Sequence, residues 1–177
     1  MDDNKLILII DDNVRNGIYL SRACRRLCPA WRITWVRPYH KAVNALPQGL
    51  IPNDITYIPN VTSLRQAENI IRENVEANSD LLVFYDLQLG LLQRNANAAY
   101  SSPITSALRE ILNSSDRKVL INIHSAELAS RAVAEHIDES FERVIYSHKM
   151  TGRDVSEIDK LVKDTLKDWD GLFVSCS

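Results

Sequence analysis

The sequence predicts an α/β domain in which a five-stranded parallel sheet is covered by helices on both faces. The aliphatic run 6–10 and the apolar and aromatic run 81–85 have no polar break and fit strands that are buried on both faces. Segments with helical periodicity separate the strand-like runs, and this alternation is typical of a doubly wound sheet. We expect strands at 6–10, 32–36, 81–85, 118–123 and 143–146, with an insert over residues 37–60 after the second strand.

The helices between these strands carry recognisable start signals. Asn13 can cap the first helix, residues 63–66 resemble a capping box, and Ser102 precedes Pro103 at the start of a later helix. Within the proline-rich insert, residues 55–58 are interpreted as an extra or alternative strand. The chain is expected to form one domain over residues 1–177, with a tail at 170–177.

Composition excludes several classes of protein. The chain has 21 basic and 23 acidic side chains and a net charge of −2, so no global field recruits nucleic acid or an acidic membrane. No apolar run approaches the roughly 18 residues of a membrane span, and the start MDDNK is unlike a signal peptide. Three cysteines, Cys24, Cys28 and Cys176, fit a reduced cytoplasmic setting. Cys24 and Cys28 share a helical face, which favours helix core over a metal or redox pair.

Polar side chains follow four of the predicted strands. Asp11 and Asp12 end the first strand, Asp86 ends the 81–85 strand, and Ser125 and Lys149 follow the last two. The carboxyl ends of such strands meet along one edge, beside the point where the strand order reverses. Three clustered carboxylates repel one another and favour a divalent cation, and oxygen ligands suit Mg²⁺. A hydroxyl and an ammonium beside them can hold phosphoryl oxygens, and a carboxylate can act as a nucleophile.

Four short motifs occur in a suggestive order. They are LIIDDN at 8–13, DLQLG at 86–90, His-Ser-Ala at 124–126, and Tyr-Ser-His-Lys at 146–149. Together they resemble a CheY-like receiver domain of two-component response regulators, over residues 5 to about 168. The resemblance implies a flavodoxin-like fold.

The resemblance also implies a Mg²⁺-dependent phosphoacceptor. Asp12, Asp86 and the backbone carbonyl of Gln88 would bind Mg²⁺, with Asp11 helping through water. Asp86 would accept a phosphoryl group from a phosphohistidine on a histidine kinase or a histidine phosphotransfer protein.

The remaining implied roles concern the response to that phosphoryl group. Ser125 and Lys149 would each bond a phosphoryl oxygen, and Tyr146 would swing inward and remodel the last helix–strand–helix face. That face is also a candidate homodimer surface. The family usually has proline after the lysine, and here the residue is Met150.

The sequence thus predicts a cytoplasmic, stand-alone signalling protein that switches the binding of a target protein. Its only chemistry would be its own phosphorylation and dephosphorylation. The alternative is a receiver-like interaction module that works without phosphate, motivated by the insert and by Met150. A phosphohydrolase with Asp86 as nucleophile is a third option, but Gln88 stands where such enzymes need an acid.

Each candidate residue also has a purely structural interpretation. Asp11 and Asp12 can be a helix-capping acid and its neighbour, and Asp86 can be an N-cap or turn acid after a strand. Ser125 can be an N-cap. Lys149 can be a solvated lysine, and Tyr146 an ordinary half-buried aromatic. His124 and His148 are interpreted as neighbours of the site rather than cation ligands, and Trp31, Trp35 and Trp169 as packing residues.

Overall fold

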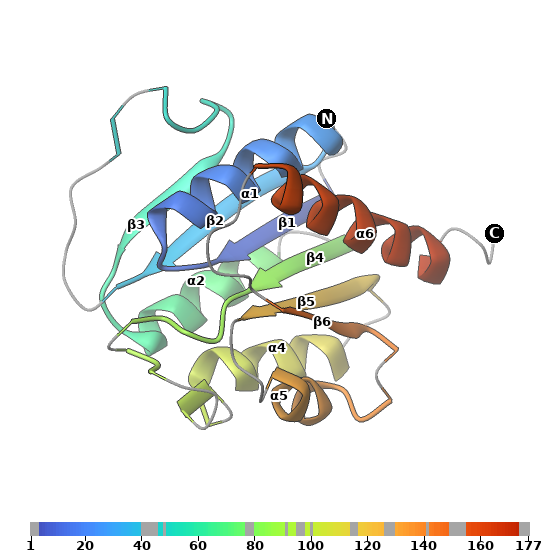
Figure 1. The fold of residues 1–177 in the computed structure, drawn as a ribbon. Coiled ribbons are helices and arrows are strands. Elements are labelled where there is room, and N and C mark those ends of the chain that lie inside the picture. Colours follow the sequence, from blue (N-terminus) through green and yellow to red (C-terminus); the bar gives the residue numbers. More distant parts are fainter. Residues whose placement is uncertain are drawn as a thin grey trace.

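The chain forms a single six-stranded sheet with helices on both sides (Figure 1). The computed structural model describes residues 4–39, 46–47, 49–76, 80–90, 92–94, 98–99, 101–113, 117–125, 130–140, 142–148 and 155–173. The strands are β1 Lys5–Ile10, β2 Arg32–Pro38, β3 Thr56–Val61, β4 Asp80–Tyr85, β5 Val119–Ser125 and β6 Val144–His148. The helices are α1 Val14–Leu27, α2 Leu64–Glu76, α4 Pro103–Asn113, α5 Ser130–Ile137 and α6 Val155–Phe173.

The predicted parallel sheet is confirmed, but the predicted number of five strands is wrong. The order is β3-β2-β1-β4-β5-β6, and every neighbouring pair is parallel. Without β3 the order would be that of flavodoxin-like sheets, and with it the order is that of Rossmann-type sheets. The sixth strand comes from the insert and includes most of the 55–58 run. That run is interpreted from the sequence as an extra or alternative strand, and Pro59 is tolerated in β3 because this strand lies at the sheet edge.

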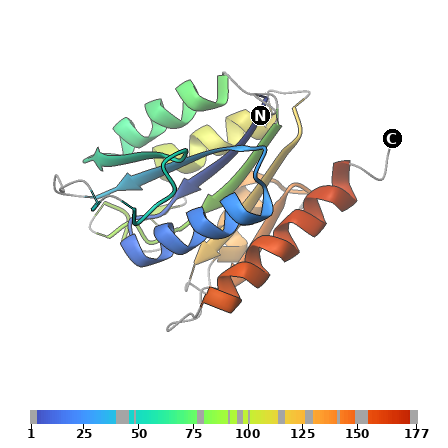
Figure 2. The same ribbon diagram turned by 90° about the horizontal axis from the view of Figure 1, so that it is seen from above.

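Two core clusters cover the two faces of the sheet. Figures 1 and 2 show α1 and α6 side by side on one face, and α2, α4 and α5 on the other. The central strands supply both clusters, and residues 6–10 of β1 have no solvent exposure. The two apolar runs therefore behave as predicted for strands that are buried on both faces.

The predicted helix starts are confirmed by hydrogen bonds. The side-chain oxygen of Asn13 accepts from the backbone N–H groups of Arg15 and Asn16. Ser63 Oγ accepts from the N–H of Gln66 at 3.1 Å, whose side chain in turn accepts from the N–H of Thr62. These bonds satisfy donors that the first turn of a helix leaves without an intrahelical partner.

The insert is anchored on the α1 face. Asp54 forms an ion pair with Arg25 of α1 at 2.9 Å. Tyr57 of β3 packs on Trp35 of β2 with ring centroids 4.5 Å apart. Trp35 in turn lies directly beneath Gly17 of α1, where a Cβ atom would come within 2.0 Å of the indole. Glycine at this position is therefore what allows α1 to approach the sheet over a tryptophan.

The last helix is longer than the sequence predicts. Residues 170–173, assigned to a tail, are the final turn of α6, and Leu172 and Phe173 pack against the core cluster on that face. Among the helices in the described part of the chain, none is both long and apolar enough to cross a membrane.

Replacing Gly17 by alanine should destabilise the fold. The new Cβ would overlap the Trp35 indole, and overpacking of this kind costs about 1 to 3 kcal/mol. Chemical denaturation of G17A measures the loss. Gly171→Ala is the matched control, because no atom lies within 4 Å of its added Cβ and alanine favours a helix by about 0.5 to 1 kcal/mol. Equal stability of the two variants would contradict this packing.

Glu68 on α2 should make stability depend on pH. Burial by itself would raise the pKa of Glu68, but hydrogen bonds and charges from Arg65 and Arg72 outweigh it and lower that pKa. The ion pairs therefore stabilise the fold fully above about pH 4.3, the ordinary glutamate pKa, and their contribution is lost as pH falls through the lower folded pKa.

The comparison of E68Q with wild type tests this. E68Q should be less stable than wild type at neutral pH, and the gap in unfolding free energy should close in acid. Glu73→Gln on the exposed side of the same helix is the control and should show no such gap. A gap for E68Q that stays constant down to acid pH would contradict the assignment.

Candidate functional site: three carboxylates at the carboxyl edge of the sheet

Asp11, Asp12 and Asp86 meet where β1 and β4 end. One carboxylate oxygen from each lies within 4.8 Å of the others. Asp11 and Asp86 are each 1% exposed, and Asp12 is half-buried. The clustering predicted for these three acids is therefore present in the fold.

The register of the two central strands produces this cluster. Ile10 of β1 pairs with Tyr85 of β4, so Asp11 and Asp86 are the next residues on adjacent parallel strands. The N–H of Asp86 donates to the carbonyl of Ile10 at 2.9 Å and continues the ladder. The sheet order reverses between these same strands, and ligands of open α/β sheets bind at that switch point.

The backbone of Asp11 is held from the neighbouring strand β2. Its carbonyl accepts a hydrogen bond from Trp35 Nε1 at 2.9 Å, and its N–H donates to the carbonyl of Val36 at 3.3 Å. Its Oδ1 accepts from the N–H of Asn13 at 2.7 Å. The Trp35–Gly17 packing thus supports the site as well as the core.

The loop after β4 is fixed from beneath. Asp86 Oδ1 accepts from the N–H of Gln88 at 3.0 Å. Gln93 is fully buried and donates to the carbonyl of Leu87 and to the hydroxyl of Tyr85, both at 2.9 Å. Burial raises the pKa of Tyr85, so the phenol stays protonated at neutral pH and can serve in this network.

Gly90 and Arg37 border the exposed side of the cluster. Gly90 has φ of +56°, and a Cβ there would lie 3.0 Å from Asp12 Oδ2. Arg37 Nε donates to the carbonyl of Asp12 at 2.9 Å, and its guanidinium lies over the ring of Tyr39. Only one of the five guanidinium N–H groups is used by the Nε bond.

Two residues at the end of β5 lie at the same edge. His124 is 1% exposed, and its Nε2 is 3.8 Å from Asp11 Oδ2, beyond hydrogen-bond distance. This position fits the prediction that His124 is a neighbour of the site. Ser125 is fully buried at the last position of β5.

The other predicted site residues are placed less fully. Gln88 is half-buried beside Asp86, and Tyr146 of β6 is 50% exposed. Lys149, Met150 and Ala126 lie outside the described residues, as does the side chain of His148. Their predicted roles stay predictions.

Arg37 and Gly90 are missed by the sequence interpretation. Arg37 follows the 32–36 run, so the rule that selected the acids at strand ends would also have selected it. Gly90 is visible only as the end of DLQLG. Its closeness to Asp12 depends on how the loop after β4 folds back.

The donor set suits a hard divalent cation. Three carboxylates bring negative charge to one point, and bringing ionised carboxylates out of water is costly unless a positive charge compensates them. Oxygen donors match Mg²⁺, Ca²⁺ and Mn²⁺. Asp11, Asp12 and Asp86 are the residues that would hold the ion, and such an ion polarises phosphate oxygens and bound water.

The amino end of α1, next to the cluster, is not arranged to bind phosphate directly. The N–H groups of Arg15 and Asn16 already donate to Asn13 Oδ1. These are donors that a dinucleotide site uses for pyrophosphate. A phosphate at this edge would therefore have to be held through a cation or a side chain.

Comparisons with known proteins give the fold but no family. No family model matches the chain, and no curated protein matches it. TubZ of Clostridium botulinum phage c-st is similar in structure, with a TM-score of 0.51 and 11% identity over 96% of this chain. The chain spans 60% of the TubZ chain. A candidate MAR1 ribonuclease from Leishmania major has a TM-score of 0.50 and 13% identity, covering 90% of this chain and 92% of its own.

The predicted resemblance to a receiver domain is wrong. The structural neighbours are TubZ and MAR1 ribonuclease-like proteins rather than receivers, and no family model supports the assignment. The predictions that Asp86 accepts a phosphoryl group and that the protein acts in two-component signalling are therefore wrong too. The alternative of a phosphate-independent receiver-like module also has no support. A kinase or phosphotransfer partner rested on the same resemblance and stays an untested prediction.

The physical reason for this error is general. Any doubly wound sheet brings the residues after its parallel strands to one edge, in chain order. The order of acids, a serine and a lysine can therefore arise in any such sheet, because these residue types are common at strand ends. The prediction of a cation site does not depend on the family. It rests only on the negative charges of the acids and on their positions at strand ends.

Gly90→Ala should disturb the cluster specifically. Alanine at positive φ costs about 1 to 2 kcal/mol, and its Cβ would also push the Asp12 carboxylate. Gly49→Ala is the matched control, since Gly49 has φ of +82° but no atom within 4 Å of an added Cβ. Both variants should lose similar stability in denaturation, but only G90A should bind Mn²⁺ more weakly in calorimetric titration. Equal Mn²⁺ affinity of G90A and G49A would exclude a role of Gly90 at the cluster.

Proposed function

We propose that this protein binds a divalent cation, Mg²⁺ in the cell, through Asp11, Asp12 and Asp86, and that the cation holds a phosphate group of a ligand. The burial of two carboxylates side by side, with a third within 4.8 Å, carries this proposal. Surface acids often cluster without a cation. Here Asp11 and Asp86 are inside the fold, where their mutual repulsion is stronger than in water.

The phosphate part of the proposal follows from the open side of the cluster. Mg²⁺ is typically bound by one or two carboxylates together with waters and substrate phosphates. Asp12 is half-buried, so that side of the ion would face solvent and a ligand. Arg37 is anchored on the Asp12 carbonyl, and its remaining N–H groups suit phosphate oxygens.

The ligand should bind only with the cation present. The N–H groups of Arg15 and Asn16 in the first turn of α1 already donate to Asn13, and a phosphate close to three carboxylates would be repelled without a counter-ion. We also keep a reduced, cytoplasmic setting as part of the proposal, supported by the buried free thiols of Cys24 and Cys28.

Hydrolysis of a phosphodiester is the second candidate function. The observation that favours it is His124, a buried imidazole 3.8 Å from Asp11, where it could accept a proton from cation-bound water. The Leishmania major neighbour is named a ribonuclease, which makes RNA a sensible first substrate to try. Release of short RNA fragments that requires both Mg²⁺ and His124 would select this candidate over binding alone.

Cation binding should be visible as stabilisation. Wild type should gain about 2.7 kcal/mol of unfolding free energy when Mg²⁺ is present at 100 times its Kd. Asp86→Asn should lose this gain.

Asp80→Asn is the matched control, because Asp80 begins the strand that Asp86 follows and lies at the opposite edge. D80N should respond to Mg²⁺ as wild type does. A melting temperature of wild type that does not change with Mg²⁺, Mn²⁺ or Ca²⁺ would overturn the proposal. Inorganic phosphate, added next, should bind only to the cation-loaded wild type.

A further inference from the structure

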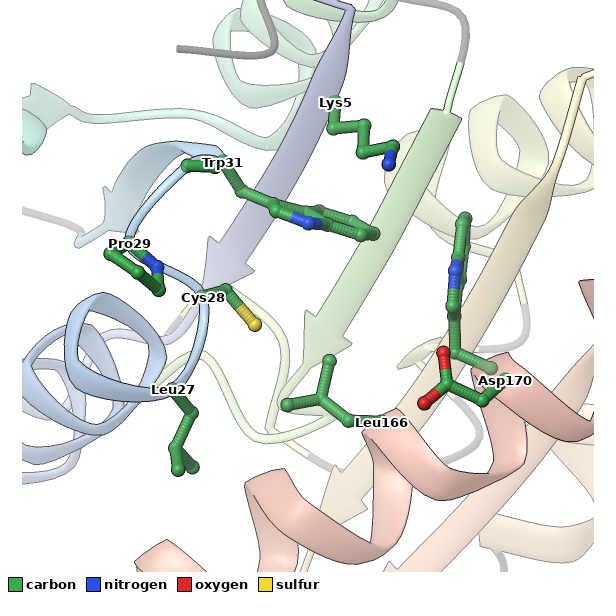
Figure 3. Close-up of a pocket in the computed structure, with 9 residues that line it drawn as sticks. Lys5, Leu27, Cys28, Pro29, Trp31, Leu166 and Asp170 are labelled. Carbon is green, nitrogen blue, oxygen red and sulfur yellow. The ribbon is translucent and has the colours of Figure 1, made fainter. Parts of the chain in front are cut away.

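A cavity lies at the amino edge of the sheet, away from the carboxylate cluster. It has a volume of about 340 Å³, within the range of about 300 to 1,000 Å³ that is usual for small-molecule sites. Lys5 begins β1, and Asp11 follows its other end, so the two sites are separated by a strand of about 20 Å. The lining comes from β1, the α1–β2 turn and the last turns of α6 (Figure 3).

The walls of this cavity are aromatic and aliphatic. Trp31 and Trp169 meet edge to face with ring centroids 5.1 Å apart, and Leu166 lies beside them. Trp169 is 4% exposed and backed by Phe173, whereas Trp31 is only half-buried. Figure 3 shows the Trp31 indole reaching across the cavity toward α6.

The cavity also contains charges of both signs. The Lys5 ammonium lies 5.7 Å from the centre of the Trp31 ring, and the Asp170 carboxylate reaches in from α6 (Figure 3). Within the described part of the chain, the Asp170 carboxylate forms no hydrogen bond or ion pair. Burial first, and then the charge of Asp170, raise the pKa of the Cys28 thiol to about 11, so this lining group is neutral at pH 7.

We propose that this cavity binds a free α-amino acid with a large apolar side chain, such as phenylalanine. The ligand carboxylate would face Lys5, its ammonium would face Asp170, and its side chain would pack on Trp31, Trp169 and Leu166. A simple anion would be repelled by Asp170 and a simple cation by Lys5. A zwitterion with an apolar body matches both charges and the walls.

Intrinsic tryptophan fluorescence tests this on the whole chain. Trp31 and Trp169 line the cavity, while Trp35 is buried beneath α1, so ligand binding should change the emission of two of the three tryptophans. L-phenylalanine should give a saturable change. Phenethylamine, which has no carboxylate, and 3-phenylpropionate, which has no ammonium, should each bind about tenfold more weakly or worse.

Two variants test which ligand group each charge of the cavity binds. Asp170→Asn should weaken phenylalanine binding about tenfold and leave phenylpropionate binding no weaker, whereas Lys5→Met should weaken phenylalanine and leave phenethylamine no weaker. Asp168→Asn is the matched control, an exposed acid two residues earlier on α6 that does not line the cavity.

The result that would overturn the proposal is a lack of saturable emission change with millimolar phenylalanine, or equal affinity for phenylalanine and both analogues. An equal loss in D168N and D170N would overturn it too. The test is independent of the cation site, because D86N should bind phenylalanine as wild type does.

Discussion

The alignment of β1 with β4 is the constraint on which the carboxylate site depends. Both strands are apolar on both sides, so their acids can only stand where the strands leave the core. Pairing of Ile10 with Tyr85 makes both strands end at the same level, and Asp11 and Asp86 then become neighbours. A shift of one residue would separate them and break the ladder that ends with the Asp86 N–H.

Strand β2 holds the backbone of two of the acids. Trp35 bonds to the carbonyl of Asp11, and Arg37 bonds to the carbonyl of Asp12, both from β2. The same tryptophan fills the space that Gly17 leaves under α1 and carries Tyr57 of the insert. The insert therefore does more than lengthen the chain. It adds an edge strand and covers the residue that supports the site from the side of β2.

Much of the fold was accessible from the sequence, and the family was not. Uninterrupted apolar runs, capping residues such as Asn13 and Ser63, and the strand–helix alternation report local energies that act within a few residues. Residue types at strand ends do not identify a family, because acids and serine at these positions recur in unrelated doubly wound proteins. The 55–58 run is interpreted from the sequence as an extra or alternative strand, and its pairing with β2 at the sheet edge makes it the sixth strand, where Pro59 is acceptable.

The sequence by itself determined that this chain forms a parallel α/β sheet and that Asp11, Asp12 and Asp86 leave it at one edge. Hydrophobic patterning determines those features. A run of apolar residues with no polar break must be buried, so the acids that follow it stand where the strand leaves the core. Tertiary structure alone decided the six-strand order, the approach of Gly90 to Asp12, the Trp35 support and the cavity between Trp31 and Trp169. Each of these depends on contacts between residues that are far apart in the chain. Local sequence patterns do not specify how close such residues come in space.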